Sequence, residues 1–420
     1  MRNLKLNARI LAALLPAAVH AARTGPAAAL YDVRHAARTG PAAALYDVRA
    51  TYGVVYGRAL VNCTNGSTSL CGGSKQLTLD LYEPVGAPDD RPALVLIHGG
   101  SYCVLDANET GEVDQANYFA ARGWTSASIN YRLSSDRGNF PPGYEDFEPL
   151  FNASSWWGNN WDHMYPAVRD AKAAIRWVRS QSKALGLDSA FIAVSGSSAG
   201  AESVMTLLAA REGDFKDELD DPTMATTHPN ESSAIFGAVS QWGAACARRA
   251  DILRTRRGDA AAATWRFRGG GSRRRRGRDV NSPRRSRRRR GRDVNSPWRS
   301  RRRRGRDADS PWRRPDPRRG YSVETCPRLR YGVEILEWKA GAPRIAADSP
   351  PLLAIAGTND TVIVPENSEW LCARYAGVGA DCELHLLDGW GHDAWNATLP
   401  GSESQNHRAV AFLEALVAGT

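Results

Sequence analysis

The sequence has little that would indicate a membrane protein, a metalloprotein or a repeat protein. Beyond the N-terminus it has no run of about 18 apolar residues, the length that a membrane-spanning helix needs. Its seven cysteines form no Cys-x-x-Cys pair and no cluster with histidine, so no metal site is indicated and no cofactor is implied. No repeat has the length of a solenoid unit. The length of 420 residues is enough for one large α/β domain with additions, or for two or three smaller domains.

Excess positive charge is confined to one segment. The chain has a formal net charge of +10, but residues 272–313 alone hold 19 Arg and four Asp, a net +15, which leaves 10 − 15 = −5 elsewhere. Three near-copies of the unit SRRRRGRDVNSPWR fill this segment, and they contain too few apolar residues to form a core. We therefore expect residues 248–320 to be a disordered, low-complexity insertion into the domain.

The N-terminus has the pattern of a secretory signal peptide over residues 1–21. A basic start is followed by the apolar run 10–19, and small residues then permit cleavage after Ala21. Residues 20–34 recur unchanged at 35–49, and we expect the segment 22–50 to be disordered. Six N-x-[ST] sequons also favour a secreted or lumenal glycoprotein; they begin at Asn62, Asn65, Asn108, Asn152, Asn230 and Asn396.

The cysteine spacing agrees with an oxidising compartment. Cys63 and Cys71 bracket one polar loop, and Cys372 and Cys382 bracket a Gly-rich one, so each pair is a candidate disulfide. A third pair is possible between Cys246 and Cys326, which would leave Cys103 unpaired, although spacing alone does not fix the connectivity.

The parts of the chain on either side of the insertion, 51–247 and 321–420, alternate strand-like and helix-like stretches. This alternation predicts an α/β fold with a mostly parallel, doubly wound sheet flanked by helices. Apolar runs or period-two patterns predict strands at 76–82, 93–97, 125–131, 191–194, 236–240, 352–356 and 383–387. Periodic apolar residues predict helices at 165–185, 199–210, 366–375 and 407–417.

One motif points to a nucleophile. Residues 196–200 read Gly-Ser-Ser-Ala-Gly, which matches G-x-S-x-G, and they lie between a predicted strand and a predicted helix. Such a tight turn needs small residues two positions before and after the serine. It would expose the Ser198 hydroxyl at a helix N-terminus, whereas neither Ser195 nor Ser197 has glycine at both positions.

Three further elements end predicted strands in the order that this chemistry requires. Gly99 and Gly100 follow the strand 93–97, and their N–H groups, with that of Ala199, could form an oxyanion hole. Asp360 follows the strand 352–356, and His392 follows the strand 383–387. We predict that Ser198, His392 and Asp360 are nucleophile, general base and orienting acid. Asp388 and Asp393 also lie near His392 in sequence, but neither ends a buried strand.

Taken together, the segments HGGS, INYRLS, DAKAAIRWVRSQSKALGLD, GSSAG, SPPLLAIAGTNDTVIVP and GWGHDAW resemble the carboxylesterase branch of the α/β-hydrolase superfamily. They are most similar to the bifunctional feruloyl and acetyl-xylan esterase-like group, near the hormone-sensitive-lipase-like esterases. The resemblance covers about residues 75–250 and 345–420. It implies the α/β-hydrolase fold, the same triad and the same oxyanion donors, and it implies a small-molecule or carbohydrate ester as substrate, without a cofactor or an obligatory protein partner.

The chain departs from these relatives in ways that bear on substrate choice. Ser101 stands where many relatives have a third glycine, and about residues 138–163 form an aromatic-rich insertion. This insertion could stack on a sugar ring or an aromatic acyl group, or it could simply pack onto the sheet. The residues that we expect to bind substrate are Ser101, Tyr102, Trp156, Trp157 and Trp161.

Two other functions are compatible with these patterns. The same triad could cleave amides or formamides instead of esters. Alternatively, a non-catalytic hydrolase-like body could bind polyanions through its Arg-rich insertion. An intact triad argues against pure binding, and a secretory leader argues against nucleic acid as the partner.

Overall fold

A computed structural model describes residues 44–63, 71–139, 160–216, 228–244, 344–401 and 403–419, with backbone alone at 160–163. The chain divides into two units, one formed by residues 1–263 with 318–420 and the other by residues 264–317. Every described residue belongs to the first unit. The predicted leader, most of the duplicated segment and the Arg-rich insertion lie outside the described residues.

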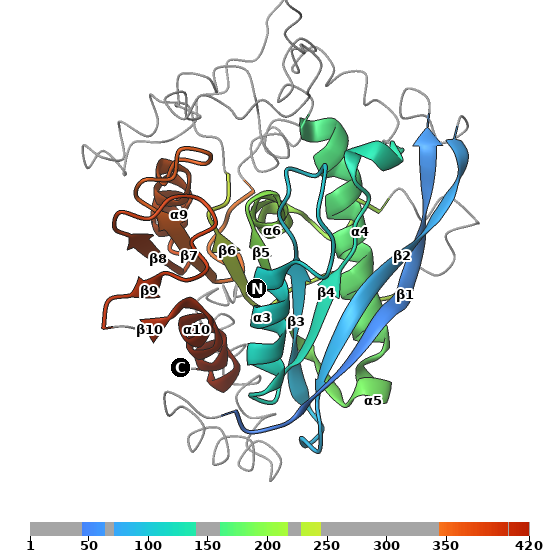
Figure 1. The fold of residues 1–420 in the computed structure, drawn as a ribbon, viewed down its shortest axis with the longest axis horizontal. Helices are drawn as coiled ribbons and strands as arrows, with labels where there is room; N and C mark the ends of the chain where they lie inside the picture. Colours follow the sequence, from blue (N-terminus) through green and yellow to red (C-terminus); the bar gives the residue numbers. More distant parts are fainter. Residues whose placement is uncertain are drawn as a thin grey trace, which may run out of the picture. The chain divides into compact units, whose positions relative to one another are not determined.

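The described part of the chain is built on one sheet of eight strands, in the order β1-β2-β4-β3-β5-β6-β7-β8 (Figure 1). The strands are β1 (Val48–Cys63), β2 (Cys71–Pro84), β3 (Arg91–Ile97), β4 (Thr125–Ile129), β5 (Leu187–Ser197), β6 (Ala238–Gln241), β7 (Leu352–Gly357) and β8 (Cys382–Leu387). The pairs β1–β2 and β2–β4 are antiparallel, and every other pair is parallel. This is the predicted α/β-hydrolase architecture, and all seven predicted strands are present.

Strand β1 was not predicted. It begins at Val48, three residues before the domain start that we expected at 51, because Val48 already pairs with Pro84. The sequence therefore places this boundary slightly too late, and the end of the duplicated segment belongs to the sheet. Register shifts after Thr51 and Val55 interrupt the period-two pattern, which explains why the strand is hard to recognise.

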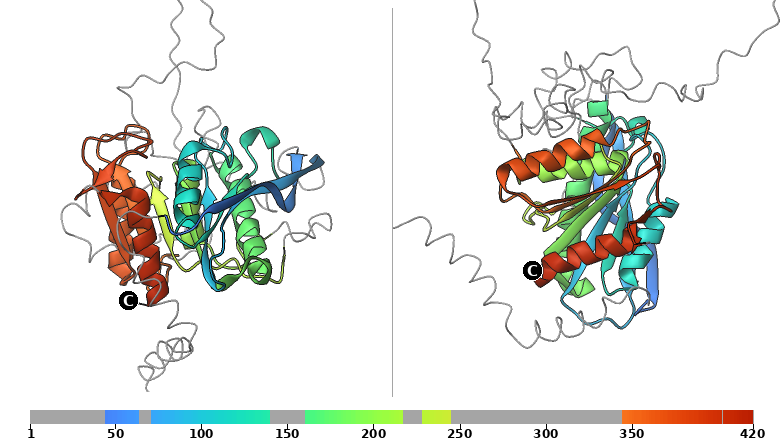
Figure 2. Two further views of the ribbon diagram at one scale, coloured as in Figure 1. Left: turned by 60° about the horizontal axis from the view of Figure 1, so that its bottom comes forward. Right: turned by 90° about the vertical axis from the view of Figure 1, so that its left-hand side faces the viewer.

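Helices cover both faces of the sheet (Figure 2). One face is covered by α3 (Thr110–Ala120) and α10 (Gln405–Ala418), whose buried side chains share one hydrophobic cluster. The other is covered by α4 (Asn160–Ser180), α6 (Ala199–Ala209) and α9 (Glu366–Val378), which share a second cluster. The predicted helix 165–185 is thus α4 followed by the short α5 (Ser182–Leu185), whereas α3 was not predicted.

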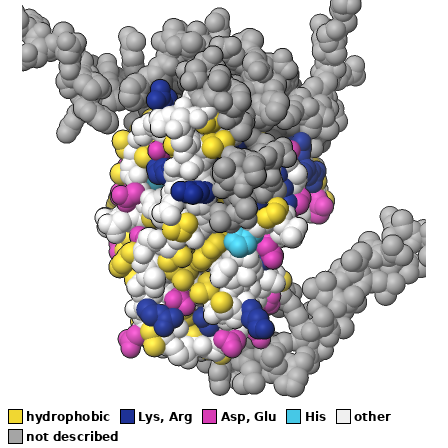
Figure 3. Space-filling model, turned by 90° about the vertical axis from the view of Figure 1, so that its right-hand side faces the viewer, with side chains coloured by type: hydrophobic (Ala, Val, Ile, Leu, Met, Phe, Trp, Pro, Cys, Tyr) yellow, Lys and Arg dark blue, Asp and Glu magenta, His cyan; other side chains and the backbone are white. Residues whose placement is uncertain are grey.

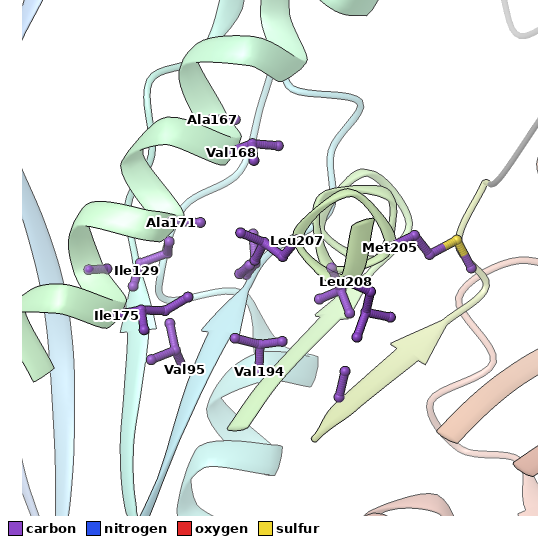
Figure 4. Packing of buried hydrophobic residues seen from close by; sticks show 14 of the residues in the cluster. Val95, Ile129, Ala167, Val168, Ala171, Ile175, Val194, Met205, Leu207 and Leu208 are labelled. Atoms are coloured by element: carbon purple, nitrogen blue, oxygen red, sulfur yellow. The ribbon is translucent and has the colours of Figure 1, made fainter. Parts of the chain in front are cut away.

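The predicted apolar stripe of α4 packs on the sheet as expected. Val168, Ala171 and Ile175 point toward side chains of the central strands, including Val95 and Val194 (Figure 4). All five side chains are fully buried. Burial of one such aliphatic side chain contributes roughly 1.5–3 kcal/mol, so this layer holds the central strands, and the loops that follow them, in fixed positions.

A buried ion pair fixes the chain after β4. The Arg132 guanidinium makes two-pronged contact with the Asp170 carboxylate of α4, with an Nη2–Oδ1 distance of 2.7 Å, and both side chains are at most 1% exposed. The same carboxylate accepts a bond from the Arg132 backbone N–H, and Asn139 accepts from the guanidinium. Separating Arg132 from Asp170 would leave a buried charge without a partner, which costs free energy. The pair therefore holds the turn after β4 against α4.

The predicted disulfides Cys63–Cys71 and Cys372–Cys382 are both formed, and Cys103 is a free thiol. Cys246 and Cys326 lie outside the described residues.

Among the described helices, none is both long and apolar enough to cross a bilayer. On the face shown in Figure 3, acidic, basic and hydrophobic side chains are intermingled. This face therefore presents no field of a single sign.

Candidate active site

Six parallel strands end at the same edge of the sheet, and the candidate catalytic residues follow three of them, β5, β7 and β8. Ser198 lies between β5 and α6 with φ 50° and ψ −116°, a conformation that is strained for a residue with a side chain. A Cβ at Gly196 would lie 2.5 Å from the Gly200 carbonyl carbon, and one at Gly200 would lie 1.8 Å from the Ile97 carbonyl oxygen. Both glycines are therefore required for this turn, as the sequence predicts.

The structure brings the three predicted triad residues together. The His392 Nε2 atom lies 2.9 Å from Ser198 Oγ, and His392 Nδ1 lies 2.7 Å from Asp360 Oδ2. The side chain of Asp360 is fully buried, whereas 14% of the His392 side chain is exposed. The line from acid to base to hydroxyl thus runs from the protein interior toward solvent.

The hydrogen bonds of Asp360 fix the histidine tautomer. Asp360 Oδ1 already accepts from the backbone N–H groups of Val362 and Ile363, at 2.8 and 2.9 Å. A carboxylate can only accept, so Nδ1 of His392 donates to Oδ2 and Nε2 is left to accept a proton from Ser198. The rival Asp388 instead accepts a bond from Thr358, and Asp393 is exposed.

The turn after β3 lies beside the nucleophile. A Cβ built on Gly99 would lie 3.2 Å from Ser198 Cβ, and Gly100 has φ +92°. Within the described residues, the N–H groups of Gly99, Gly100 and Ala199 donate to no acceptor. Buried N–H groups are almost always paired. Two of these unbonded N–H groups belong to residues that adjoin the nucleophile, since Ala199 follows Ser198 and Gly99 packs against it.

The predicted substrate-binding residues are only partly supported by their positions. Tyr102 is fully buried in the core, and its hydroxyl lies 3.2 Å from Ser203 Oγ, so its side chain faces the protein interior instead of a substrate. The prediction for Tyr102 is wrong because its φ of 59° turns the side chain inward. Ser101 is half-buried in the same turn. Trp156, Trp157 and the Trp161 side chain lie outside the described residues.

Two buried acids near the nucleophile were not predicted from the sequence. Glu112 of α3 is 1% exposed, and its Oε1 accepts a bond from Ser197 Oγ at 2.5 Å. Burial raises the pKa of Glu112 to about 7. Glu202 of α6 is also buried, and burial raises its pKa well above the usual range. Both carboxyls lie close enough to Tyr131 to influence its ionisation.

Two tryptophans also pack around the base. The Trp242 ring, which follows β6, lies edge-on to the rings of His392 at 6.4 Å and Trp395 at 5.0 Å. A Cβ at Gly111 of α3 would lie 2.1 Å from the Trp395 ring, so α3 packs directly against the loop that carries the base. The only sequence signal for these contacts is the clustering of tryptophan near His392.

The comparisons with known proteins agree with this geometry. The BD-FAE family model matches residues 79–151 and 158–246, which include the turn after β3 and Ser198. Gut esterase 1 of Caenorhabditis elegans is 33% identical over 135 residues, 32% of this chain and 21% of that protein. Para-nitrobenzyl esterase of Bacillus subtilis is 31% identical over 165 residues, 38% of this chain and 31% of that protein. The chain thus spans less than a third of the length of either relative.

Solved structures of an esterase from Thermogutta terrifontis, Est2, are also similar. The native form has a TM-score of 0.46 at 18% identity, and the match covers 89% of this chain and 93% of the Est2 chain. The butyrate-bound form has a TM-score of 0.47 at 18% identity, with 86% and 94% covered.

The family match begins at β2 and runs to the residues after β6, so it covers the sheet strands that carry the nucleophile and its glycine turn. The strand order, the strained backbone at Ser198 and the family match all agree with the predicted α/β-hydrolase fold. The chain has the predicted α/β-hydrolase fold, and over residues 79–151 and 158–246 it is similar to the BD-FAE family.

Proposed function

We propose that this protein is a serine hydrolase that cleaves carboxylic esters through an acyl-enzyme intermediate. One observation carries the proposal: Ser198, His392 and Asp360 form a continuous hydrogen-bonded line, with distances of 2.9 and 2.7 Å. A serine hydroxyl is a weak nucleophile near neutral pH, and this arrangement supplies the base that it needs.

In the proposed acylation step, Ser198 Oγ attacks the ester carbonyl carbon while His392 Nε2 takes the hydroxyl proton. Asp360 stabilises the resulting imidazolium through its bond to Nδ1. The carbonyl oxygen becomes an oxyanion, which the free N–H groups bind; a single donor of this kind typically contributes about 3–4 kcal/mol. His392 then returns the proton to the departing alcohol, and the acyl group remains on Ser198.

Deacylation repeats the same steps with water. His392 removes a proton from a water molecule, which attacks the acyl carbon, and the same N–H groups bind the second oxyanion. When this second tetrahedral intermediate collapses, the carboxylic acid leaves and His392 returns the proton to Ser198 Oγ, which restores the hydroxyl. No step needs a metal or an organic cofactor. The substrates that we propose are esters of carbohydrates or of aromatic acids, in line with the matching family.

We also propose that the protein acts outside the cell or in the secretory pathway, as a glycoprotein. Two disulfides favour an oxidising compartment. The side chains of the described sequon asparagines are all exposed, as attachment of a glycan requires; these are Asn62, Asn108, Asn230 and Asn396. Peptide mass mapping before and after glycosidase treatment tests this proposal.

The experiment that tests the catalytic proposal compares wild-type protein with Ser198→Ala on p-nitrophenyl butyrate. We expect the variant to lose nearly all activity and its labelling by a fluorophosphonate probe. Retention of more than about a tenth of the activity would contradict the assignment. The matched control is Ser195→Ala, at a buried serine of β5, the strand before Ser198, whose hydroxyl donates to Gln115. A parallel series of p-nitroanilides distinguishes ester from amide cleavage.

A further inference from the structure

One buried tyrosine is bonded to the glycine turn. Tyr131, two residues beyond β4, is 2% exposed, and its hydroxyl lies 2.9 Å from the carbonyl oxygens of both His98 and Gly99. Carbonyl oxygens only accept, so the phenol donates, and its single proton is shared between two consecutive peptide groups.

His98 supports the same contact. Its ring stacks on the Tyr131 ring with centroids 4.2 Å apart, and its Nδ1 lies 2.8 Å from the Gly99 carbonyl oxygen. Burial lowers the pKa of His98 to about 4, so the ring is neutral near pH 7 and its proton is on Nδ1. The Gly99 carbonyl thus accepts from two buried side chains.

These contacts set the direction of the N–H groups. In a trans peptide the C=O and the following N–H point in opposite directions. The carbonyls of His98 and Gly99 are directed at Tyr131, so the N–H groups of Gly99 and Gly100 are directed away from it. Gly99 itself packs against Ser197 and Ser198.

The turn has little stiffness of its own. The peptide group between Gly99 and Gly100 is flanked by glycine on both sides, and glycine allows nearly free backbone rotation. If this peptide group rotated by half a turn, its carbonyl would take the place of the N–H and repel an oxyanion. Bonds to the carbonyl oxygens are therefore needed to keep the donors in place.

We propose that Tyr131 is a positioning residue for the oxyanion hole, and that its hydroxyl holds the Gly99 and Gly100 N–H groups toward the reacting carbonyl; this inference rests on the proposed esterase function. Tyr131 does not touch the substrate. It acts through two backbone carbonyls, and its effect appears only when negative charge develops on the substrate oxygen.

The test is Tyr131→Phe, which removes one hydroxyl and keeps the ring. With p-nitrophenyl butyrate we expect kcat to fall about 10- to 100-fold, with KM changed by less than about threefold, because the lost interaction forms in the transition state. Affinity for a trifluoromethyl ketone, whose adduct with Ser198 carries an oxyanion, should fall by a similar factor.

The matched control is Tyr375→Phe. Tyr375 is also fully buried and also donates to a backbone carbonyl, that of Pro350, at 3.2 Å, but it belongs to α9 and does not contact the turn. We expect its kcat to equal that of wild type. A kcat for Tyr131→Phe within about twofold of wild type, a change in KM alone, or an equal loss in Tyr375→Phe would overturn the inference.

If Tyr131→Phe does not fold, His98→Phe decides the question. This variant keeps a ring that can stack on Tyr131 but removes the Nδ1 donor to Gly99, so we expect the same loss of kcat at nearly constant KM. An unchanged kcat would overturn the inference. Failure of the proposed function is recognised separately, because wild-type protein would then show neither ester turnover nor reaction with the fluorophosphonate probe.

Discussion

Replacement of Glu112 by glutamine should remove a pH dependence of folding stability. Glu112 is 1% exposed in the first turn of α3, and within the described residues its Oε2 atom has no hydrogen-bond partner. Burial raises its pKa from 4.5 to about 7 in the folded protein, although the bond from Ser197 opposes this shift. The difference corresponds to roughly 3 kcal/mol between the protonated and ionised forms.

The direction in which folding stability changes with pH follows from proton binding by Glu112. Between pH 4.5 and about 7 the folded protein holds the Glu112 proton more tightly than the unfolded chain does. Stability from this group is therefore complete below pH 4.5 and is lost as the pH rises through 7. Glu112→Gln cannot ionise and keeps an oxygen acceptor for Ser197. We expect the variant to gain up to roughly 3 kcal/mol relative to wild type between pH 4.5 and pH 8.

The assay is urea unfolding of both proteins at pH 5 and pH 8, analysed as the difference between variant and wild type. Other titrating groups cancel in this difference. The control is Ser197→Ala, which keeps the carboxyl but removes the bond that favours its ionised form. Its pH dependence should remain and move to higher pH. If the difference between Glu112→Gln and wild type is the same at both pH values, the reasoning is refuted.

Three other outcomes are expected. Asp360→Asn should lower kcat by roughly 10³- to 10⁴-fold, because the imidazole adopts the wrong tautomer, whereas Asp388→Asn should stay near wild type; the reverse order in ester assays would move the acid to Asp388. Asp170→Ala should destabilise the fold by about 3–5 kcal/mol, as measured by urea unfolding, because it leaves the Arg132 charge buried without its carboxylate; a loss below about 1 kcal/mol would contradict this. Deletion of 250–320 with a short Gly/Ser linker should leave ester turnover and melting temperature unchanged; loss of either would make the segment a structural part of the hydrolase.

The sequence predicted the sheet because its signals are local, and the same signals placed the three triad candidates after predicted strands. Continuous apolar runs mark the buried parallel strands. Gly196 is required by the nearby Gly200 backbone, whereas Gly200 is required by the Ile97 carbonyl of β3, and only the G-x-S-x-G spacing marks it in the sequence. Helix α3 escaped prediction because its buried face carries Glu112 and Gln115, which interrupt the apolar periodicity. Those polar side chains are buried only because Ser197 and Ser195 lie opposite them. Such a match depends on tertiary structure, and no local pattern reveals it.

The direction of Tyr102 was beyond the sequence for a similar reason. An aromatic residue after a glycine turn can face a ligand or the core with equal ease. Here the backbone at Ser101 and Tyr102 is left-handed, and the ring lies inside the protein with its hydroxyl 3.2 Å from Ser203 Oγ. Left-handed backbone at two consecutive non-glycine residues is not encoded by composition or periodicity.

The division of the sheet between two distant chain segments has a consequence for biosynthesis. Strand β6 ends at Gln241, and its neighbour β7 begins at Leu352. A ribosome therefore completes the nucleophile and the glycine turn before any residue of β7 exists, and the base is made later still, after β8. On the proposed mechanism, the nascent chain has an exposed serine but no group to activate it. The chain becomes a hydrolase only when β7 and β8 dock, so activity reports synthesis beyond His392 as well as folding.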